Sequence, residues 1–164
     1  MTEVTDTKRV WVLVEDEPAI RLMLSVFMED WGVTPLVFST GHEAMSWLDR
    51  LEAGEIAGPP PELALLDIRV PGPRGPEIAR RMRGLPQTAG AALIFMTAYE
   101  LTERDRACLE HLADAIVGKP LPDPEVLHEM LLGLLAARQT RSTHPTDECE
   151  QSSSTLTQQP AWGR

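Results

Sequence analysis

Three acidic residues that could bind a metal ion stand directly after apolar runs of the chain. Glu15 and Asp16 follow the run that ends at Val14, and Asp67 ends a second run. Carboxylates brought close together repel one another, and some must take up a proton unless a cation lies among them. Mg²⁺ suits such a place, because it binds one or two carboxylates and keeps water or phosphate oxygens as its other ligands. The three acids therefore predict a magnesium site.

Two further side chains that suit contact with a phosphoryl group also follow apolar runs. They are Thr97, in "LIFMTA", and Lys119, in "VGKP". A carboxylate beside Mg²⁺ can attack a phosphoryl group and form an acyl phosphate. Lys119 offers a compact positive charge to the phosphoryl oxygens, and Thr97 offers a hydrogen bond. We predict Asp67 as the nucleophile, with Thr97 and Lys119 as its catalytic partners.

Apolar runs alternate with amphipathic stretches five times, which predicts the elements that position these residues. Each run is continuously apolar, as in strands covered on both faces of a parallel sheet. The stretches between them carry apolar residues at helical spacing. The pattern predicts an α/β fold with a doubly wound, five-stranded parallel sheet. The expected strands are 9–14, 33–39, 62–68, 91–98 and 113–118.

The carboxyl ends of parallel strands meet at one rim of such a sheet, and ligands bind there. All five candidate residues stand at strand ends, so we expect them to gather on that rim. The last helix is expected at 123–138, and we expect six of its apolar residues to face the sheet. These residues are Val126, Leu127, Met130, Leu131, Leu134 and Leu135.

The composition predicts one domain at 8–140, between an N-terminal extension at 1–7 and a tail at 141–164. The tail is rich in Ser, Thr and Gln and has no apolar period, so it is predicted to be disordered. The stretch "EAGEIAGPPP", residues 52–61, is expected to form a surface loop.

The net charge of −10, from 25 acids and 15 bases, argues against nucleic acid and anionic lipid as partners. The short basic stretch Arg80–Gly84 is interpreted as a solvated helix face. Cys108 and Cys149 lie far apart, which favours neither a disulfide framework nor a zinc site. There is no signal-peptide pattern, and no apolar run is long enough to span a membrane. We expect a cytoplasmic protein.

Four pieces of the chain together resemble the receiver domains of two-component response regulators. They are "VLVEDEP", "LALLDIRVPG" with Gly75 after it, "LIFMTA" and "VGKP", in the family's order. The resemblance covers residues 8–140 and implies a flavodoxin-like (βα)5 sheet with strand order 2-1-3-4-5. It implies that Glu15, Asp16, Asp67 and the backbone carbonyl of Arg69 bind Mg²⁺.

The resemblance also implies the reaction and the partners. Asp67 would take a phosphoryl group from the phosphohistidine of a histidine kinase or a histidine phosphotransfer protein, and Thr97 and Lys119 would respond. Phosphorylation would alter docking to a downstream partner, which the sequence does not identify, or pass the phosphate on. The Lys119–Pro120 bond would be cis. The family also offers a homodimer surface on the fourth helix, fifth strand and fifth helix.

Three features depart from the family pattern or are particular to this chain. Ile116 stands three residues before Lys119, where many receivers carry an aromatic ring that turns inward on phosphorylation. Arg69 and Tyr99 stand where family side chains border the path of hydrolytic water, and their bulk predicts a long-lived acyl phosphate. No output domain follows the fifth helix in this sequence, so we expect a stand-alone receiver.

Other functions fit parts of the pattern. A phosphorylation-independent interaction module with this fold is favoured by Ile116 and disfavoured by the complete set of site residues. An aspartyl-phosphate phosphatase of the haloacid dehalogenase type would place its nucleophile after the first strand, with a second Asp two residues on, where this chain has Arg69 after Asp67. A nucleotide or flavin binder would need a glycine-rich or hydroxyl-rich loop at the acids of residues 15–17.

Overall fold

The computed structural model of this protein describes residues 8–142. The extension predicted at 1–7 and all but the first two residues of the tail predicted at 141–164 lie outside the described residues. Within 8–142, every helix is too short or too polar to cross a lipid bilayer.

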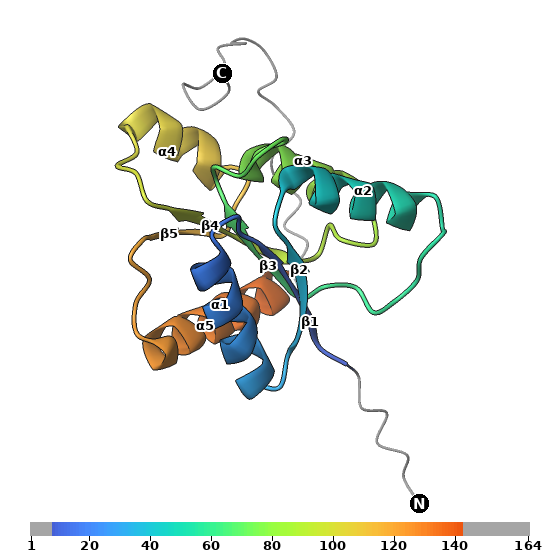
Figure 1. Cartoon of the computed structure of the whole chain (residues 1–164), viewed down its shortest axis with the longest axis horizontal. Coiled ribbons are helices and arrows are strands. Elements are labelled where there is room, and N and C mark those ends of the chain that lie inside the picture. Colours follow the sequence, from blue (N-terminus) through green and yellow to red (C-terminus); the bar gives the residue numbers. More distant parts are fainter. Residues whose placement is uncertain (1–7, 143–164) are drawn as a thin grey trace, which may run out of the picture.

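One parallel sheet of five strands forms the centre of the molecule, in the order β2-β1-β3-β4-β5 (Figure 1). This confirms both the fold class and the strand order. Every residue of β3 and β4 is buried, because helices cover both faces of these central strands. β2 lies at one edge, and its residues are only partly buried. The strands are β1 (Val10–Val14), β2 (Thr34–Phe38), β3 (Leu63–Asp67), β4 (Ala92–Thr97) and β5 (Ala115–Gly118).

Five helices cover the sheet in two layers (Figure 1). α1 (Pro18–Asp30) and α5 (Pro124–Ser142) contribute to the hydrophobic cluster on one face. α2 (Gly41–Glu52), α3 (Gly75–Gly84) and α4 (Glu103–Glu110) contribute to the cluster on the other face. A doubly wound sheet has helices on both faces in this way, and the arrangement leaves the strand ends open.

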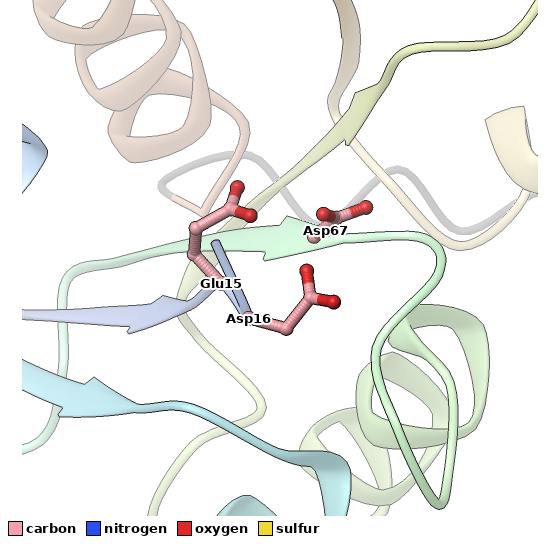
Figure 2. Close-up of side chains that lie close together, drawn as sticks. All are labelled: Glu15, Asp16 and Asp67. Atoms are coloured by element: carbon pink, nitrogen blue, oxygen red, sulfur yellow. The ribbon is translucent and has the colours of Figure 1, made fainter. Parts of the chain in front are cut away.

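The register of the sheet brings the candidate site residues to a single rim. Val14 pairs with Leu66, so the chain after β1 emerges beside the end of β3. Asp67 pairs with Met96, and Thr97 pairs with Gly118. Figure 2 shows Glu15 and Asp16 just beyond β1, with Asp67 at the end of β3. The parallel register therefore converts strand ends that are far apart in sequence into neighbours.

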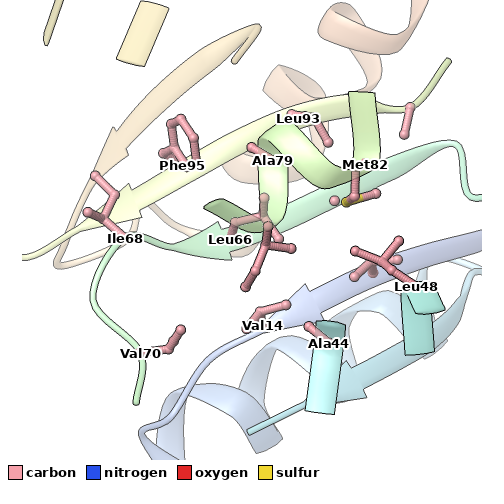
Figure 3. Close-up of a cluster of buried hydrophobic side chains, with 14 of the residues drawn as sticks. Val14, Ala44, Leu48, Leu66, Ile68, Val70, Ala79, Met82, Leu93 and Phe95 are labelled. Carbon is pink, nitrogen blue, oxygen red and sulfur yellow. The ribbon is translucent and has the colours of Figure 1, made fainter. Parts of the chain in front are cut away.

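The core between the sheet and the helices α2 and α3 consists mostly of aliphatic side chains, in line with the low aromatic content of 5%. Figure 3 shows Leu66 and Phe95 of the central strands in one cluster with Leu48 of α2 and Met82 of α3. Fully burying one such side chain contributes about 1.5–3 kcal/mol. Close packing of these side chains against α2 and α3 thus stabilises the sheet that carries the site.

Local sequence signals explain where the first helices begin and end. Gly32 follows α1 with φ of 76°, a left-handed conformation that glycine adopts without steric cost. The Thr40 hydroxyl caps α2 by accepting a hydrogen bond from the Glu43 N–H at 3.2 Å. The Glu43 carboxylate accepts a hydrogen bond from the N–H of Ser39 at 2.8 Å, one residue before the N-cap Thr40.

The last helix differs from its prediction in two respects. α5 runs to Ser142, past the expected end at residue 138 and past the domain end predicted at 140. Val126 was predicted to face the sheet, but its side chain is 55% exposed. Leu127, Leu131 and Leu135 fill the buried stripe, and Val126, one residue before Leu127, is rotated out of it.

Candidate functional site

Three carboxylates converge at the carboxyl rim of the sheet, as the sequence predicted. Glu15, Asp16 and Asp67 can each offer one oxygen such that all three atoms lie within 4.8 Å of one another. Glu15 is fully buried, Asp67 is nearly so, and Asp16 is exposed. Figure 2 shows the side chains grouped in one place, although they come from two strand ends. The cluster is therefore open to a ligand on the side of Asp16.

Lys119 bridges two of these acids from the end of β5. Its ammonium nitrogen lies 2.7 Å from a carboxylate oxygen of Glu15 and 2.9 Å from one of Asp67. The Lys119–Pro120 peptide bond is cis, as the resemblance implied. The lysine is brought to the rim because Lys119 N–H donates to the Thr97 carbonyl at 2.7 Å, which extends the β4–β5 pairing by one residue.

The electrostatics of the rim show an excess of negative charge in a buried setting. Burial raises the pKa of Glu15, and the nearby charge of Asp67 adds to this. Hydrogen bonds from Lys119 and from the Glu17 N–H offset only part of the increase. Burial by itself lowers the pKa of Lys119, but its contacts with Glu15 and Asp67 outweigh that effect and raise it. Both pKa values are raised, as expected where one ammonium group lies among more than one carboxylate. A second cation would therefore stabilise the cluster.

Asp67 is held in place by the backbone around it. One of its carboxylate oxygens accepts the Arg69 N–H at 3.0 Å, while the other binds Lys119. Gly75, at the start of α3, approaches so closely that a Cβ there would lie 2.5 Å from the Asp67 carbonyl oxygen. A side chain at residue 75 would therefore push α3 away from the strand end. This contact gives a physical reason for the glycine that follows "LALLDIRVPG".

The Thr97 hydroxyl is engaged with the following turn. It accepts the Tyr99 N–H at 3.1 Å and lies 3.4 Å from the Tyr99 carbonyl oxygen. Thr97 thus stands at the rim where it was predicted, but its hydroxyl stabilises the β4–α4 turn. Rotation of this side chain would be needed before the hydroxyl could reach a group bound at Asp67.

Arg69 and Tyr99 meet across the mouth of the site. The guanidinium carbon of Arg69 lies 3.9 Å from the centre of the Tyr99 ring, a cation–π contact. Both side chains line the cavity of about 450 Å³ that also contains Glu15, Asp67 and Lys119. Sequence reasoning named both residues but missed their contact, because no spacing rule links a β3–α3 loop to a β4–α4 loop.

This geometry can bind a hard cation and can present one carboxylate to an electrophile. Glu15 and Asp16 offer oxygen ligands, Asp67 offers an oxygen held by Arg69 N–H and Lys119, and the cavity above them is open. Oxygen ligands of this kind suit Mg²⁺ better than softer metals. Acyl phosphate formation needs little more than positioning and neutralisation of charge.

Comparison with known sequences identifies the family. A family profile described as the response regulator receiver domain matches residues 12–132. The cyclic di-GMP phosphodiesterase response regulator RpfG of Xanthomonas campestris is 34% identical over 130 residues, which are 78% of this chain and 32% of that protein. The phosphate regulon transcriptional regulatory protein PhoB of Rhizobium meliloti is 36% identical over 117 residues, 70% of this chain and 47% of that protein. The chain thus spans less than half the length of these two relatives.

Solved structures agree with this. The CheY-like receiver domain of Methanospirillum hungatei has a TM-score of 0.66 at 25% identity and covers 82% of this chain and 98% of its own. The receiver domain of the sensor histidine kinase PA1611 of Pseudomonas aeruginosa, solved with a magnesium ion in its active site cleft, has a TM-score of 0.64 at 20% identity, covering 79% of this chain and 98% of its own. At that identity the second likeness supports the fold alone. Because the family profile covers most of the chain and the fold agrees, this protein belongs to the response regulator receiver domain family of two-component signalling.

Proposed function

We propose that this chain is a phosphoacceptor, with Asp67 taking a phosphoryl group from the phosphohistidine of a histidine kinase or a histidine phosphotransfer protein. The observation that carries the proposal is the grouping of Glu15, Asp16 and Asp67 within 4.8 Å, with Lys119 bridging two of them. Three acids at the strand ends of one rim, with a single lysine among them, are costly unless a cation and an anionic ligand complete the site.

In the proposed reaction, an Asp67 carboxylate oxygen forms a bond to phosphorus while the bond from phosphorus to the imidazole nitrogen breaks. The electron pair of that bond stays on the imidazole. Lys119 neutralises a phosphoryl oxygen, and the Thr97 hydroxyl donates a hydrogen bond to another once it leaves Tyr99. The outcome is an aspartyl phosphate on Asp67. Its charge alters docking to a partner, or the phosphoryl group is transferred to another protein.

Glu15, Asp16, Asp67 and the backbone carbonyl of Arg69 are the groups we assign to Mg²⁺. The fit rests on the donor set, since hard oxygens clustered within 4.8 Å suit a small divalent cation. When bound, Mg²⁺ supplies positive charge to phosphoryl oxygens and keeps the acids ionised. Asp16 is the exposed member of the cluster, so it lies where a hydrated ion would enter.

A second candidate function is supported by Ile116. This residue is half-buried and packs against the core cluster under α3 and α4. An aliphatic side chain there cannot exchange a hydroxyl between solvent and interior, so the chain could dock to partners without a phosphorylation signal. The two functions differ in one respect: a phosphorylation-independent module would not respond to a phosphodonor.

Labelling of the purified chain by the small phosphodonor phosphoramidate, with and without Mg²⁺, tests the proposal. We expect covalent labelling in the parent protein and in Asp30→Asn, a matched change at the exposed end of α1, away from the rim. Asp67→Asn should abolish labelling, because the amide cannot form the acyl phosphate. Labelling that persists in Asp67→Asn, or its absence from a folded parent that binds Mg²⁺, would reject the phosphoacceptor function.

A further inference from the structure

Two hollows lie at the amino edge of the sheet, where the strands begin, on the side away from the acidic rim. The basic hollow has a volume of about 520 Å³ and the apolar hollow about 660 Å³. Pro60 and Pro61, from the loop before β3, line both, so the hollows adjoin one another. Both prolines belong to the 52–61 loop, which therefore contributes to the walls of both hollows.

The basic hollow is lined by Arg138 and Arg141 near the end of α5, with Leu135, Gln139, Glu62 and Gly90. Arg138, Arg141 and Arg83 all pair with one carboxylate, that of Asp114. Glu62 is already paired with Arg9 at 3.0 Å. Two positive charges are thus left in excess, on a protein whose net charge is −10. The side chain of Arg141 is 69% exposed, so part of this charge faces solvent.

The apolar hollow lies between the start of the edge strand β2, the end of α2 and the 52–61 loop. Within the described part of the chain, its lining is mainly aliphatic, proline and indole surface, with Thr34 and Gln87 as polar residues and Lys8 as the one charged residue. Such a surface suits an aromatic or proline-rich ligand segment. Lining residues include Val10, Pro35, Leu36, Trp47, Leu51 and Ile56.

We propose that the chain's own C-terminal segment, residues 143–164, docks along these two hollows. The described part of the chain ends at Ser142, directly after Arg141, so the segment starts at the mouth of the basic hollow. An extended chain advances about 3.3–3.6 Å per residue. Asp147 can therefore lie up to about 17 Å from Ser142, and the twentieth residue after Ser142, Trp162, can reach the far end of the apolar hollow.

The order of residues in this segment matches the order of the hollows. Asp147, Glu148 and Glu150 come first, where the chain leaves the arginines of α5, and they supply the charge that the basic hollow lacks. Pro160, Ala161 and Trp162 come last and supply apolar surface for the second hollow. Charge complementarity sets the near contact and burial of the indole sets the far one. This proposal does not depend on phosphorylation of Asp67.

Cys149 allows the near contact to be tested in the full-length chain. In a Cys108→Ser background, Cys149 is the single thiol, and a nitroxide attached to it sits among the three acids. We expect the label to broaden the backbone amide signals of Glu62 and Gly90 in NMR spectra. The amides of Ala98 and Tyr99, on the opposite rim, should keep their intensity relative to the sample with reduced nitroxide.

A charge-reversed tail is the matched control, because its length and label are unchanged. With Asp147→Lys, Glu148→Lys and Glu150→Lys, the signals of Glu62 and Gly90 should recover several-fold. A Gln158→Lys, Gln159→Lys variant also adds positive charge to the tail but keeps the three acids, so the broadening of Glu62 and Gly90 should remain. Equal broadening with and without the acids would overturn the proposal. Broadening that appears between a labelled chain and a separate isotope-enriched chain would also overturn it, because the occupant would be a second copy.

The far contact has its own readout in the four tryptophan indole N–H signals. Trp47 lines the apolar hollow, whereas Trp31 packs on the other face of the sheet against His128. Trp162→Ala should shift the Trp47 signal and leave that of Trp31 in place. An unmoved Trp47 signal would show that the indole of residue 162 does not occupy the hollow and would reject this part of the proposal.

Discussion

The two ends of the sheet hold charge clusters of opposite imbalance. At the carboxyl rim, three carboxylates lie close together, and the ammonium group of Lys119 pairs with two of them, Glu15 and Asp67. At the amino edge, three guanidinium groups share one carboxylate, that of Asp114. The same sheet therefore carries an acid-rich cluster at one end and a base-rich cluster at the other.

The two clusters also differ in how completely ion pairs and hydrogen bonds neutralise the buried acid of each, Asp114 and Glu15. Asp114 is bound by Arg83, Arg138 and the Leu93 N–H at 2.9–3.1 Å, which ties α3, β4 and α5 together. Glu15 has Lys119 and the Glu17 N–H, yet its pKa is still raised by burial. A satisfied buried acid stabilises a fold, whereas an under-neutralised one is poised to bind a cation. The rim thus has the charge imbalance expected of a cation site, whereas the Asp114 cluster ties neighbouring elements together at the amino edge.

Removal of magnesium should produce the largest difference between the two ends. We expect chelation with EDTA to abolish phosphoramidate labelling of Asp67, because the excess negative charge would then repel the phosphodonor. In NMR titrations, Mg²⁺ should shift the amide signals of Glu15 and Asp16. The signals of Leu93 and Asp114, at the other end, should stay fixed. Shifts of equal size at both ends would contradict the assigned metal site.

Loss of the Asp114 carboxylate should have the largest effect on stability. Asp114→Ala leaves three arginines facing one another and the Leu93 N–H without its partner. Breaking buried ion pairs costs several kcal/mol, and since Arg83 and Arg138 are about a quarter exposed we expect a loss of about 3 kcal/mol in the free energy of unfolding. Urea denaturation measures it.

Asp49→Ala is the matched control for Asp114→Ala. Asp49 also pairs with an arginine, Arg81, at 3.1 Å, but its side chain is 67% exposed and Arg81 keeps Glu52 as a second partner. Exposed pairs of this kind contribute at most about 1 kcal/mol. Similar losses for the two variants would show that the Asp114 cluster does not hold the amino edge together.

Neutralising the buried acid of the rim should act in the opposite direction. Glu15→Gln removes a buried charge whose pKa is raised by burial, so at neutral pH without Mg²⁺ we expect a gain in stability, smaller than the loss for Asp114→Ala. Because the folded state holds the Glu15 proton more tightly than the unfolded state, the parent recovers stability as the pH falls. The advantage of Gln should therefore vanish near and below pH 4.5, the ordinary pKa of the group.

The same variant should lose its response to magnesium. Added Mg²⁺ should raise the melting temperature of the parent by binding the folded state only. Glu15→Gln, which lacks one of the assigned carboxylates, should respond less. If Glu15→Gln is less stable than the parent without Mg²⁺, Lys119 already neutralises the buried Glu15 carboxylate, and the predicted gain in stability is wrong.

The smallest expected effect concerns the cover of the rim. Arg69→Ala with Tyr99→Ala removes the cation–π contact at the cavity mouth, worth about 0.5–1 kcal/mol at an exposed site. We expect the aspartyl phosphate to be lost a few-fold faster, because water reaches it more easily, while labelling still occurs. A single Arg69→Lys variant keeps the charge and should show an intermediate rate. An unchanged lifetime in the double variant would reject the shielding role.

Much of the fold was predictable because it depends on patterns that are local in the chain. Continuous apolar runs identified all five strands, and their alternation with helices indicated a parallel sheet. The errors lie where a helix face or helix end is decided by a few residues. Val126 is one residue away from the buried stripe of α5, and the α5 end at Ser142 was placed four residues early.

The basic stretch Arg80–Gly84 shows a different kind of failure. It was interpreted as a solvated helix face, and this is wrong for Arg83. That side chain is 25% exposed, pairs with Asp114 and donates to the carbonyls of Ala89 and Ala91. The apolar periodicity of a helix cannot reveal such partners, because they lie in the loops that precede β4 and β5.

By itself the sequence determined that Glu15, Asp16, Asp67, Thr97 and Lys119 would share one rim. The physical reason is that parallel strands of similar length end together, so a residue just after each strand has only one place to be. The tertiary structure alone decided what each side chain does there: Lys119 bridges Glu15 and Asp67, the Thr97 hydroxyl faces Tyr99, and Arg69 covers the Tyr99 ring. Such contacts depend on loop paths and side-chain rotamers, which are set by neighbours distant in the sequence.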